Sequence, residues 1–415
     1  MGTQKREYSR LINTIITLGS ILIGLGILLF VASNWDKINR PAKILIIFSV
    51  ISLFNLGVYY FRFIKNTYLG LTEGFCLIGS FAFGAGIWLI AQIYQIHYNF
   101  SAGILFWILG ILAAAYIYRS WTVMVLSSIL SLIWLSSYQS YYFNREAYGF
   151  FALAALIMTL AYDLKSRFSI FIIIVSTCVW IAHFWTLAHS GLDNYYWEHG
   201  MYTAHLLLAA IYMLFGFLLY GAGMWQARIQ RLVSYSFLYK FFGIVFIAFS
   251  TYSITFVHHY SKHHSGYCPP AIMALILILA VLSAVIISYL YNLAKNKQDL
   301  IESGILFYFL IASLSAIFLS FAFPAAGSGL INILLIVEIL GFIYLGFAIN
   351  SEGIFRLGIL IFFIDVLSRY FDILWKMMPR SLLFIFGGAL LIAGAVFVDR
   401  KRRQLEEKMR KTPIK

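Results

Sequence analysis

The sequence predicts an all-α integral membrane protein, a polytopic bundle of about 14 transmembrane helices with both termini in the cytoplasm. Of its 415 residues, 62% are hydrophobic and only 11% are charged, whereas soluble domains average about 45–50% and 25%. Apolar windows of about 20 residues, the length that crosses a bilayer core, recur along the whole chain. Lysine and arginine gather in alternate connections between these windows.

The apolar windows follow one another with short polar connections. In chain order they cover 11–32, 44–61, 72–96, 101–118, 121–137, 148–162, 168–187, 202–223, 237–256, 270–292, 301–322, 327–348, 352–368 and 381–398. The first is longer than the apolar part of a signal peptide, so we expect it to stay as the first helix. Two windows, 121–137 and 148–162, are short, and 352–368 contains Arg356 and Asp365. A bundle of about twelve spans is therefore the alternative.

Positive charge predicts the orientation. When the termini and every second connection are assigned to one side, that side carries 22 of the 30 lysines and arginines and the other carries 8. Cytoplasmic connections hold the excess of positive charge, so both termini are predicted to lie inside. All nine histidines then fall outside. The net charge of +14 is explained by orientation and by contact with anionic lipid headgroups at the cytoplasmic face, and no nucleic-acid partner is expected.

The segment 73–96, EGFCLIGSFAFGAGIWLIAQIYQI, is rich in small residues. Ser80 and Gly84 stand four residues apart, the spacing at which small side chains let two membrane helices approach closely. The first window and the last carry similar small residues. We therefore expect the helix over 72–96 to run through the centre of the bundle.

Polar residues stand at the ends of the first and third windows: Asn34, Trp35, Asp36, Glu73, Gln92 and Gln95. The glutamate lies at the predicted inner end of its helix, and the others lie near the outer surface. One interpretation is structural, in which these groups cap helix ends and hold the two helices in register. The other interpretation is a binding site that faces outward.

These two clusters also carry a resemblance to a known family. GILLFVASNWDKI, followed by LTEGFCLIGSFAFGAGIWLIAQIYQI and FWILGILAAAYIY, resembles the bacterial membrane family called domain of unknown function 2157. The matching residues are Asn34, Trp35, Asp36, Glu73, Gly86, Gln92, Ile93 and Tyr94. The resemblance implies a protein of the bacterial inner membrane, and it implies no established activity.

The chain is accordingly divided into four parts. These are a short basic cytoplasmic N-terminus (1–10), a family-like segment of four helices (11–118), the remaining helices of the same bundle (119–398) and a basic cytoplasmic tail (399–415). No part is polar enough to form a separate soluble domain.

Glu338 lies near the middle of the window 327–348. A charged group at mid-bilayer is costly, so this side chain should face protein or water. Asp365, on the returning window, comes within about one helical turn of the same depth, which would allow the two carboxyls to share a proton. Glu338 is therefore either a protonated, hydrogen-bonded structural group or a proton or cation site. Asp365 can also pair with Arg369, four residues on.

The connection HHYSKHHSGYC, residues 258–268, is the candidate for metal binding. If it is helical, His259 and His263 share a face and could hold a transition metal with His264 or Cys268. A pH-sensitive connection and an ordinary hydrated one are the alternatives. No cofactor is expected.

Three classes of function remain open. The sequence lacks GxSxG, HExxH and a phosphate-binding glycine loop with lysine, so an enzyme is disfavoured. A membrane enzyme acting on lipid-linked substrates would have to use dispersed residues such as Asp36, Arg145, His199 and Arg369. A proton- or cation-coupled transporter would use Glu338. A scaffold or regulatory protein that acts through envelope partners is the favoured interpretation.

The predicted orientation can be tested by chemical labelling in intact cells. A single cysteine placed in the arginine-rich tail should react only after the membrane is permeabilised, whereas one at His263 should react with an impermeant thiol reagent from outside. Both sites should lie in aqueous connections, because neither falls in an apolar window. Equal reactivity of the two sites in intact cells would contradict the assigned topology.

Overall fold

The computed structural model describes residues 39–65, 69–96, 100–137, 149–189, 201–257, 270–294, 296–322 and 324–377, with helical positions between 15 and 29 and at 388 and 392. Every regular element in these ranges is a helix, which confirms the predicted all-α class. Nine of the described helices are long and apolar enough to cross a membrane. The count of fourteen spans and their orientation stay predictions.

The described helices, in chain order, are α2 (Arg40–Tyr59) with a π-helical continuation η2 (Tyr60–Lys65), α3 (Leu69–Ile93), α4 (Phe100–Tyr118), α5 (Trp121–Ser136), α6 (Gly149–Asp163), α7 (Arg167–His189), α9 (Met201–Ala227), α10 (Val233–Val257), α11 (Pro270–Asn292), α12 (Lys297–Ala322), α13 (Pro324–Ala348) and α14 (Glu352–Met377). Three of these helices, α5, α6 and α14, are not among the nine that are long and apolar enough to cross a membrane. Their apolar windows are short or contain charged residues. α5 has 16 residues and α6 has 15, and α14 carries several ionised side chains.

Three tight turns between successive helices are built in the same way. Each has a residue with positive φ followed by serine, and these residues are Arg119 (45°), Lys165 (56°) and Asn350 (53°). The serine N–H then bonds to the carbonyl five residues earlier, as Ser120 does to Ala115 at 3.2 Å. This bond satisfies a carbonyl at the end of the first helix. Ser120 is also the N-cap of α5, so one dipeptide ends one helix and begins the next.

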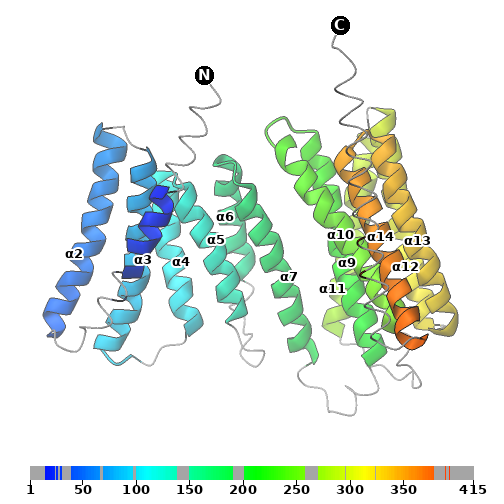
Figure 1. Cartoon of the computed structure of the whole chain (residues 1–415), viewed down its shortest axis with the longest axis horizontal. Helices are drawn as coiled ribbons and strands as arrows, with labels where there is room; N and C mark the ends of the chain where they lie inside the picture. Colours follow the sequence, from blue (N-terminus) through cyan, green and yellow to red (C-terminus); the bar gives the residue numbers. More distant parts are fainter. Residues whose placement is uncertain are drawn as a thin grey trace, which may run out of the picture. The chain divides into compact units, whose positions relative to one another are not determined.

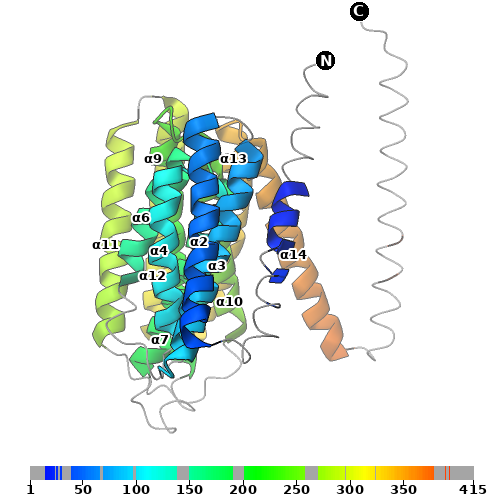
Figure 2. The ribbon, with the colours of Figure 1, turned by 90° about the vertical axis from the view of Figure 1, so that its left-hand side faces the viewer.

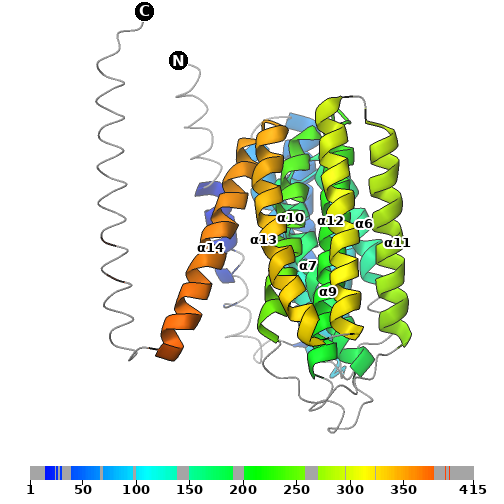
Figure 3. The ribbon, with the colours of Figure 1, turned by 90° about the vertical axis from the view of Figure 1, so that its right-hand side faces the viewer.

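The chain divides into two compact units, residues 1–243 with 257–286, and residues 244–256 with 287–415. In the first unit, α2 to α7 run alternately up and down (Figure 1), and α2, α3 and α4 lie side by side (Figure 2). Within this unit α3 contacts α2, α4 and α5. In the second unit, α13 packs against both α12 and α14, and α14 is inclined to α13 (Figure 3).

Small residues allow α3 to approach its neighbours closely. The Trp107 indole of α4 occupies the place where a Cβ at Gly84 would lie, and the Phe83 ring of α3 does the same at Gly110. The contact is therefore reciprocal, with one ring from each helix lying on a glycine of the other. Trp107 Nε1 also donates a hydrogen bond to the carbonyl of Ser80 at 2.9 Å. Both features depend on the absence of side chains on the two glycines.

The same arrangement recurs in other helix pairs. Between α2 and α3, Phe75 lies 3.2 Å from the Cβ position of Gly57, and Ile47 lies 2.9 Å from that of Gly86. In the second unit, the Phe309 ring of α12 occupies the Cβ position of Gly341 on α13. Lipid tails are as apolar as the helices, so the hydrophobic effect does not drive helices together in a membrane. Close packing at small residues provides dispersion contacts that stabilise the association instead.

Substitution of Gly84 by alanine should destabilise the protein. The added methyl group overlaps the Trp107 ring, and overpacking of this kind costs about 1–3 kcal/mol. Displacement of the indole would also remove its bond to Ser80, worth about 1 kcal/mol. The melting temperature in detergent, followed by tryptophan fluorescence, should therefore fall.

Gly304→Ala on α12 is the matched control, because a Cβ at Gly304 meets nothing within 4 Å. Alanine is favoured over glycine in helices by up to about 1 kcal/mol, so this variant should melt at or above the wild-type temperature. Equal losses of stability in the Gly84 and Gly304 variants would show that the close contact with Trp107 is unimportant.

Candidate functional site

Glu73, in the first turns of α3, reaches across to the start of α5. Its Oε2 accepts hydrogen bonds from Ser120 Oγ at 2.5 Å, from Thr122 Oγ1 at 2.7 Å and from the Thr122 backbone N–H at 3.3 Å. The first backbone N–H groups of a helix have no partner within that helix, and the helix dipole favours a negative charge there. A carboxylate from α3 therefore stabilises the N-terminus of α5.

Arg62 supplies positive charge on the other side of the same carboxylate. Its Nη1 lies 3.8 Å from Glu73 Oε1, and the two side chains are only 23% and 12% exposed. Arg62 belongs to η2, the π-helical end of α2. One carboxylate thus connects three elements, η2, α3 and α5, on the side of the first unit where α3 begins.

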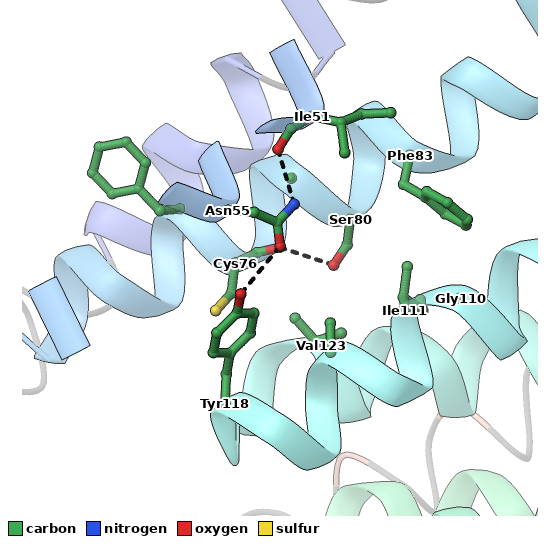
Figure 4. A pocket seen from close by; sticks show the side chains of 12 residues that line it. Ile51, Asn55, Cys76, Ser80, Phe83, Gly110, Ile111, Tyr118 and Val123 are labelled. Carbon is green, nitrogen blue, oxygen red and sulfur yellow. Dashed lines mark hydrogen bonds between the residues drawn. The ribbon is translucent and has the colours of Figure 1, made fainter. Parts of the chain in front are cut away.

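A cavity of about 80 Å³ lies one turn further along α3 (Figure 4). Its polar lining comes from Asn55 of α2, Cys76 and Ser80 of α3, and Tyr118 of α4. The remaining wall is apolar and includes Ile111 and Val123, so the space combines hydrogen-bonding groups with hydrocarbon.

The polar groups of this cavity are only loosely bonded to one another. Asn55 Nδ2 donates to the Ile51 carbonyl at 2.8 Å, and Ser80 Oγ donates to the Cys76 carbonyl at 2.8 Å. Tyr118 Oη approaches Asn55 Oδ1 only to 3.5 Å, which is the outer limit for a hydrogen bond. The Cys76 thiol lies beside the Ser120 hydroxyl that binds Glu73. The cavity and the carboxylate therefore belong to one polar region.

Glu338 is the second buried carboxyl, on α13 in the second unit. The side chain is 0% exposed, as expected for a group near the middle of an apolar helix. Its Oε1 accepts a hydrogen bond from Ser313 Oγ of α12 at 3.0 Å, and Thr251 of α10 faces the same carboxyl. Its Oε2 is buried and has no hydrogen-bond partner among the described side chains.

Asp365 makes a different contact. Its Oδ1 pairs with Arg369 Nε at 3.4 Å on the same helix, α14, and the two side chains are 14% and 34% exposed. Glu338 and Asp365 are both described, and no hydrogen bond joins them. The pairing with Arg369 is the one that the four-residue spacing indicates.

Sequence reasoning did not single out a polar network between α6, α9 and α10 in the first unit. The hydroxyls of Tyr162 and Tyr239 lie 2.7 Å apart, and Gln226 Nε2 donates to Tyr162 Oη at 2.9 Å. Lys240 nearby is 8% exposed, with its Nζ 5.7 Å from the centre of the Tyr220 ring. The available signal was a lysine inside the apolar window 237–256 and a glutamine just after the window 202–223, which indicates polar partners on neighbouring helices.

The other predicted site residues are placed as follows. Gln92 is exposed at the far end of α3, about 28 Å along the helix from Glu73, and Gln95 is exposed in the turn that follows. Outside the described residues lie Asn34, Trp35, Asp36, His259, His263, His264 and Cys268. Within the described part of the chain, no group of three or more His, Cys, Asp or Glu side chains is placed to hold a metal ion.

Comparison with known families now adds to this geometry. Residues 2–125 match the family model described as Predicted membrane protein (DUF2157), which confirms the resemblance predicted for the N-terminal part. The match includes α2, α3, α4 and the start of α5, and so includes the Glu73 contacts and the cavity. No curated protein and no solved structure matches the chain.

Replacing Glu73 by glutamine should lower stability measurably. The amide keeps the size of the side chain but removes the charge that faces the α5 N-terminus and Arg62. Hydrogen bonds to charged groups contribute about 1.5–3 kcal/mol, so we expect a clear loss of thermal stability in detergent. Increased reaction of the buried Cys76 with a small thiol reagent should accompany it.

Glu352→Gln is the matched control for this substitution. Glu352 lies in the first turn of α14 and, like Glu73, pairs with an arginine, Arg356, but the two side chains are 76% and 73% exposed. Exposed ion pairs contribute little, so this variant should melt like the wild type. If the Glu73 variant also melts like the wild type, the carboxylate does not stabilise the start of α5.

Proposed function

We propose that the protein is a multi-pass scaffold or regulatory protein of the bacterial inner membrane, with both termini in the cytoplasm. The observation that carries this proposal is that Glu73 and Glu338 each make contacts between helices. Glu73 connects η2, α3 and α5, and Glu338 connects α13 to α12. Groups used in this way favour one fixed arrangement of helices, which a protein that positions partners requires.

The placement of basic residues in the first unit supports the proposed orientation. Arg62, Arg119 and Lys165 stand at the end of α2 and at the α4–α5 and α6–α7 turns. Because α2 to α7 run alternately up and down (Figure 1), these three positions fall on the same side of the unit. An excess of basic residues is typical of the cytoplasmic side, where Arg119, with a side chain 60% exposed, would meet anionic headgroups.

Proton- or cation-coupled transport is the second candidate, and one observation favours it. Glu338 Oε2 is buried without a hydrogen-bond partner among the described side chains. A neutral carboxyl costs far less at that depth than a charged one, so a bound proton suits this site. A transport cycle would require water or a substrate cation to reach the same oxygen.

An enzyme acting on lipid-linked substrates has less support. Of the dispersed residues that it would use, Asp36, Arg145 and His199 lie outside the described residues. Arg369 is paired with Asp365.

The variant Glu338→Gln separates the scaffold from the transporter. Glutamine keeps an oxygen that can accept the Ser313 hydrogen and cannot release a proton. For a scaffold we expect a melting temperature within a few degrees of the wild type. Proton uptake by proteoliposomes can be followed with a pH-sensitive dye under an imposed potential. For a scaffold, uptake with either protein should be no faster than uptake by empty vesicles. Proton uptake by the wild type that the variant abolishes would instead establish transport.

Photo-crosslinking in cells tests the scaffold directly. A photoreactive residue at Arg119 or Lys165, on the proposed cytoplasmic turns, should give protein adducts of reproducible mass. The same residue at Phe48, an exposed position within apolar α2, is the control and should give mainly lipid adducts. Lipid adducts alone at all three positions would count against a scaffold that recruits partners on this surface.

A further inference from the structure

The cavity among α2, α3, α4 and α5 is large enough and polar enough to hold a bound molecule. Its volume is about 80 Å³, whereas one water molecule needs about 10–15 Å³ of such space. The residues on its α3 wall run from Phe75 to Phe83, about 12 Å along the helix axis. The space can therefore hold several small molecules along α3.

The polar lining has hydrogen-bonding capacity beyond the bonds that it makes to other described residues. The Asn55 amide has two N–H donors, and it donates to the Ile51 carbonyl. The hydroxyls of Ser80 and Tyr118 act as donors, and a hydroxyl oxygen also has two lone pairs that can accept. Polar groups left without partners in hydrocarbon are costly, so these atoms favour an occupant that both donates and accepts hydrogen bonds.

An apolar occupant does not meet this requirement. An acyl chain or a hydrocarbon would fill the volume and offer no partner to the second amide N–H of Asn55 or to the lone pairs of the two hydroxyls. Cavities that stay empty are lined by apolar side chains, whereas four of the residues that line this one are polar (Figure 4). A charged ligand is also disfavoured, because the residues on the wall carry no ionised side chain.

We propose that this cavity is a water-binding site that holds several water molecules between Asn55, Cys76, Ser80 and Tyr118. Each water can donate to the Tyr118, Ser80 or Asn55 oxygens and accept from the Asn55 amide or the Cys76 thiol. Cys76 also lies beside Ser120, which binds Glu73. The waters therefore extend the polar region of Glu73 along α3. This inference does not depend on the scaffold proposal.

Hydroxyl-radical footprinting of the full-length protein in detergent tests the proposal, with water itself as the probe. A short X-ray pulse converts bound water into hydroxyl radicals, which oxidise the nearest side chains. Cys76 is only 6% exposed, so rapid oxidation at this residue reports water inside the protein. The expected result is several-fold faster oxidation of Cys76 in the wild type than in a variant whose cavity is filled.

Ala114→Leu is that variant, because Ala114 lines the cavity and leucine would occupy the space. Ala113→Leu on the same helix is the matched control, since Ala113 is exposed and its substitution leaves the cavity open. We expect the control to oxidise at Cys76 like the wild type. Tyr220, which is 0% exposed and lies outside the cavity, should oxidise slowly in all three proteins.

Equal oxidation of Cys76 in the wild type and the filled variant would overturn the proposal. If the filled variant does not fold, a density map of the wild type at a resolution that shows water decides the question. Separate peaks within hydrogen-bonding distance of Asn55 and Tyr118 would support the water site. An empty cavity, or continuous density of an acyl chain, would overturn it.

Discussion

Hydrocarbon offers no hydrogen bonds, so polar groups inside this bundle depend on partners in the protein or in water bound within it. The buried serines show the simplest solution. Ser80, Ser127 and Ser283 each donate to the carbonyl four residues earlier on their own helix, at 2.7–2.9 Å. An ionised carboxylate cannot use this solution, because its oxygens only accept and a helix interior has no free N–H. Glu73 and Glu338 instead accept hydrogen bonds from side chains of neighbouring helices.

The cavity follows from the same need for close packing. Where α3 meets α2 and α4, rings from one helix lie on glycines of the other, as Trp107 does on Gly84. Nearer to Glu73 the small residues of α3 meet no ring. A Cβ at Gly79 would lie 3.4 Å from Phe54 and 3.7 Å from the Asn55 amide, and Ser80 faces the same side of the helix. Small residues opposite a short polar side chain leave space, and that space becomes the cavity.

The sequence was sufficient to predict features that depend on one helix at a time. The apolar windows predicted the positions of the described helices. The small residues of 72–96 predicted a helix at the centre of the bundle, and α3 contacts α2, α4 and α5. The expectation that Glu338 faces protein or water agrees with its complete burial. The short windows 121–137 and 148–162 and the charged window 352–368 were also recognisable, and their helices are the three outside the set of nine.

Features that depend on two or more helices could not be predicted in the same way. That Glu73 binds Ser120 and Thr122 requires α3 and α5 to be neighbours, and no residue pattern in either window states this. The partner of Glu338 was sought in Asp365, at a similar depth, whereas the hydrogen bond comes from Ser313 of the preceding helix. Depth alone does not fix which face of a helix a side chain occupies. The Tyr162–Tyr239–Gln226 network was missed for the same reason, since its members lie on three helices.

The two buried carboxyls differ in a way that bears on function. Glu73 has partners at both oxygens, a cation on one side and a helix N-terminus on the other, so a change in its protonation would weaken several contacts at once. Glu338 has a partner at Oε1 and a buried Oε2 with none among the described side chains, so fewer contacts depend on its protonation, and its neutral form costs far less at that depth than its charged form. The family match ends at residue 125. Glu73, Arg62, the start of α5 and the adjoining cavity lie within the matched range, whereas Glu338 lies beyond it.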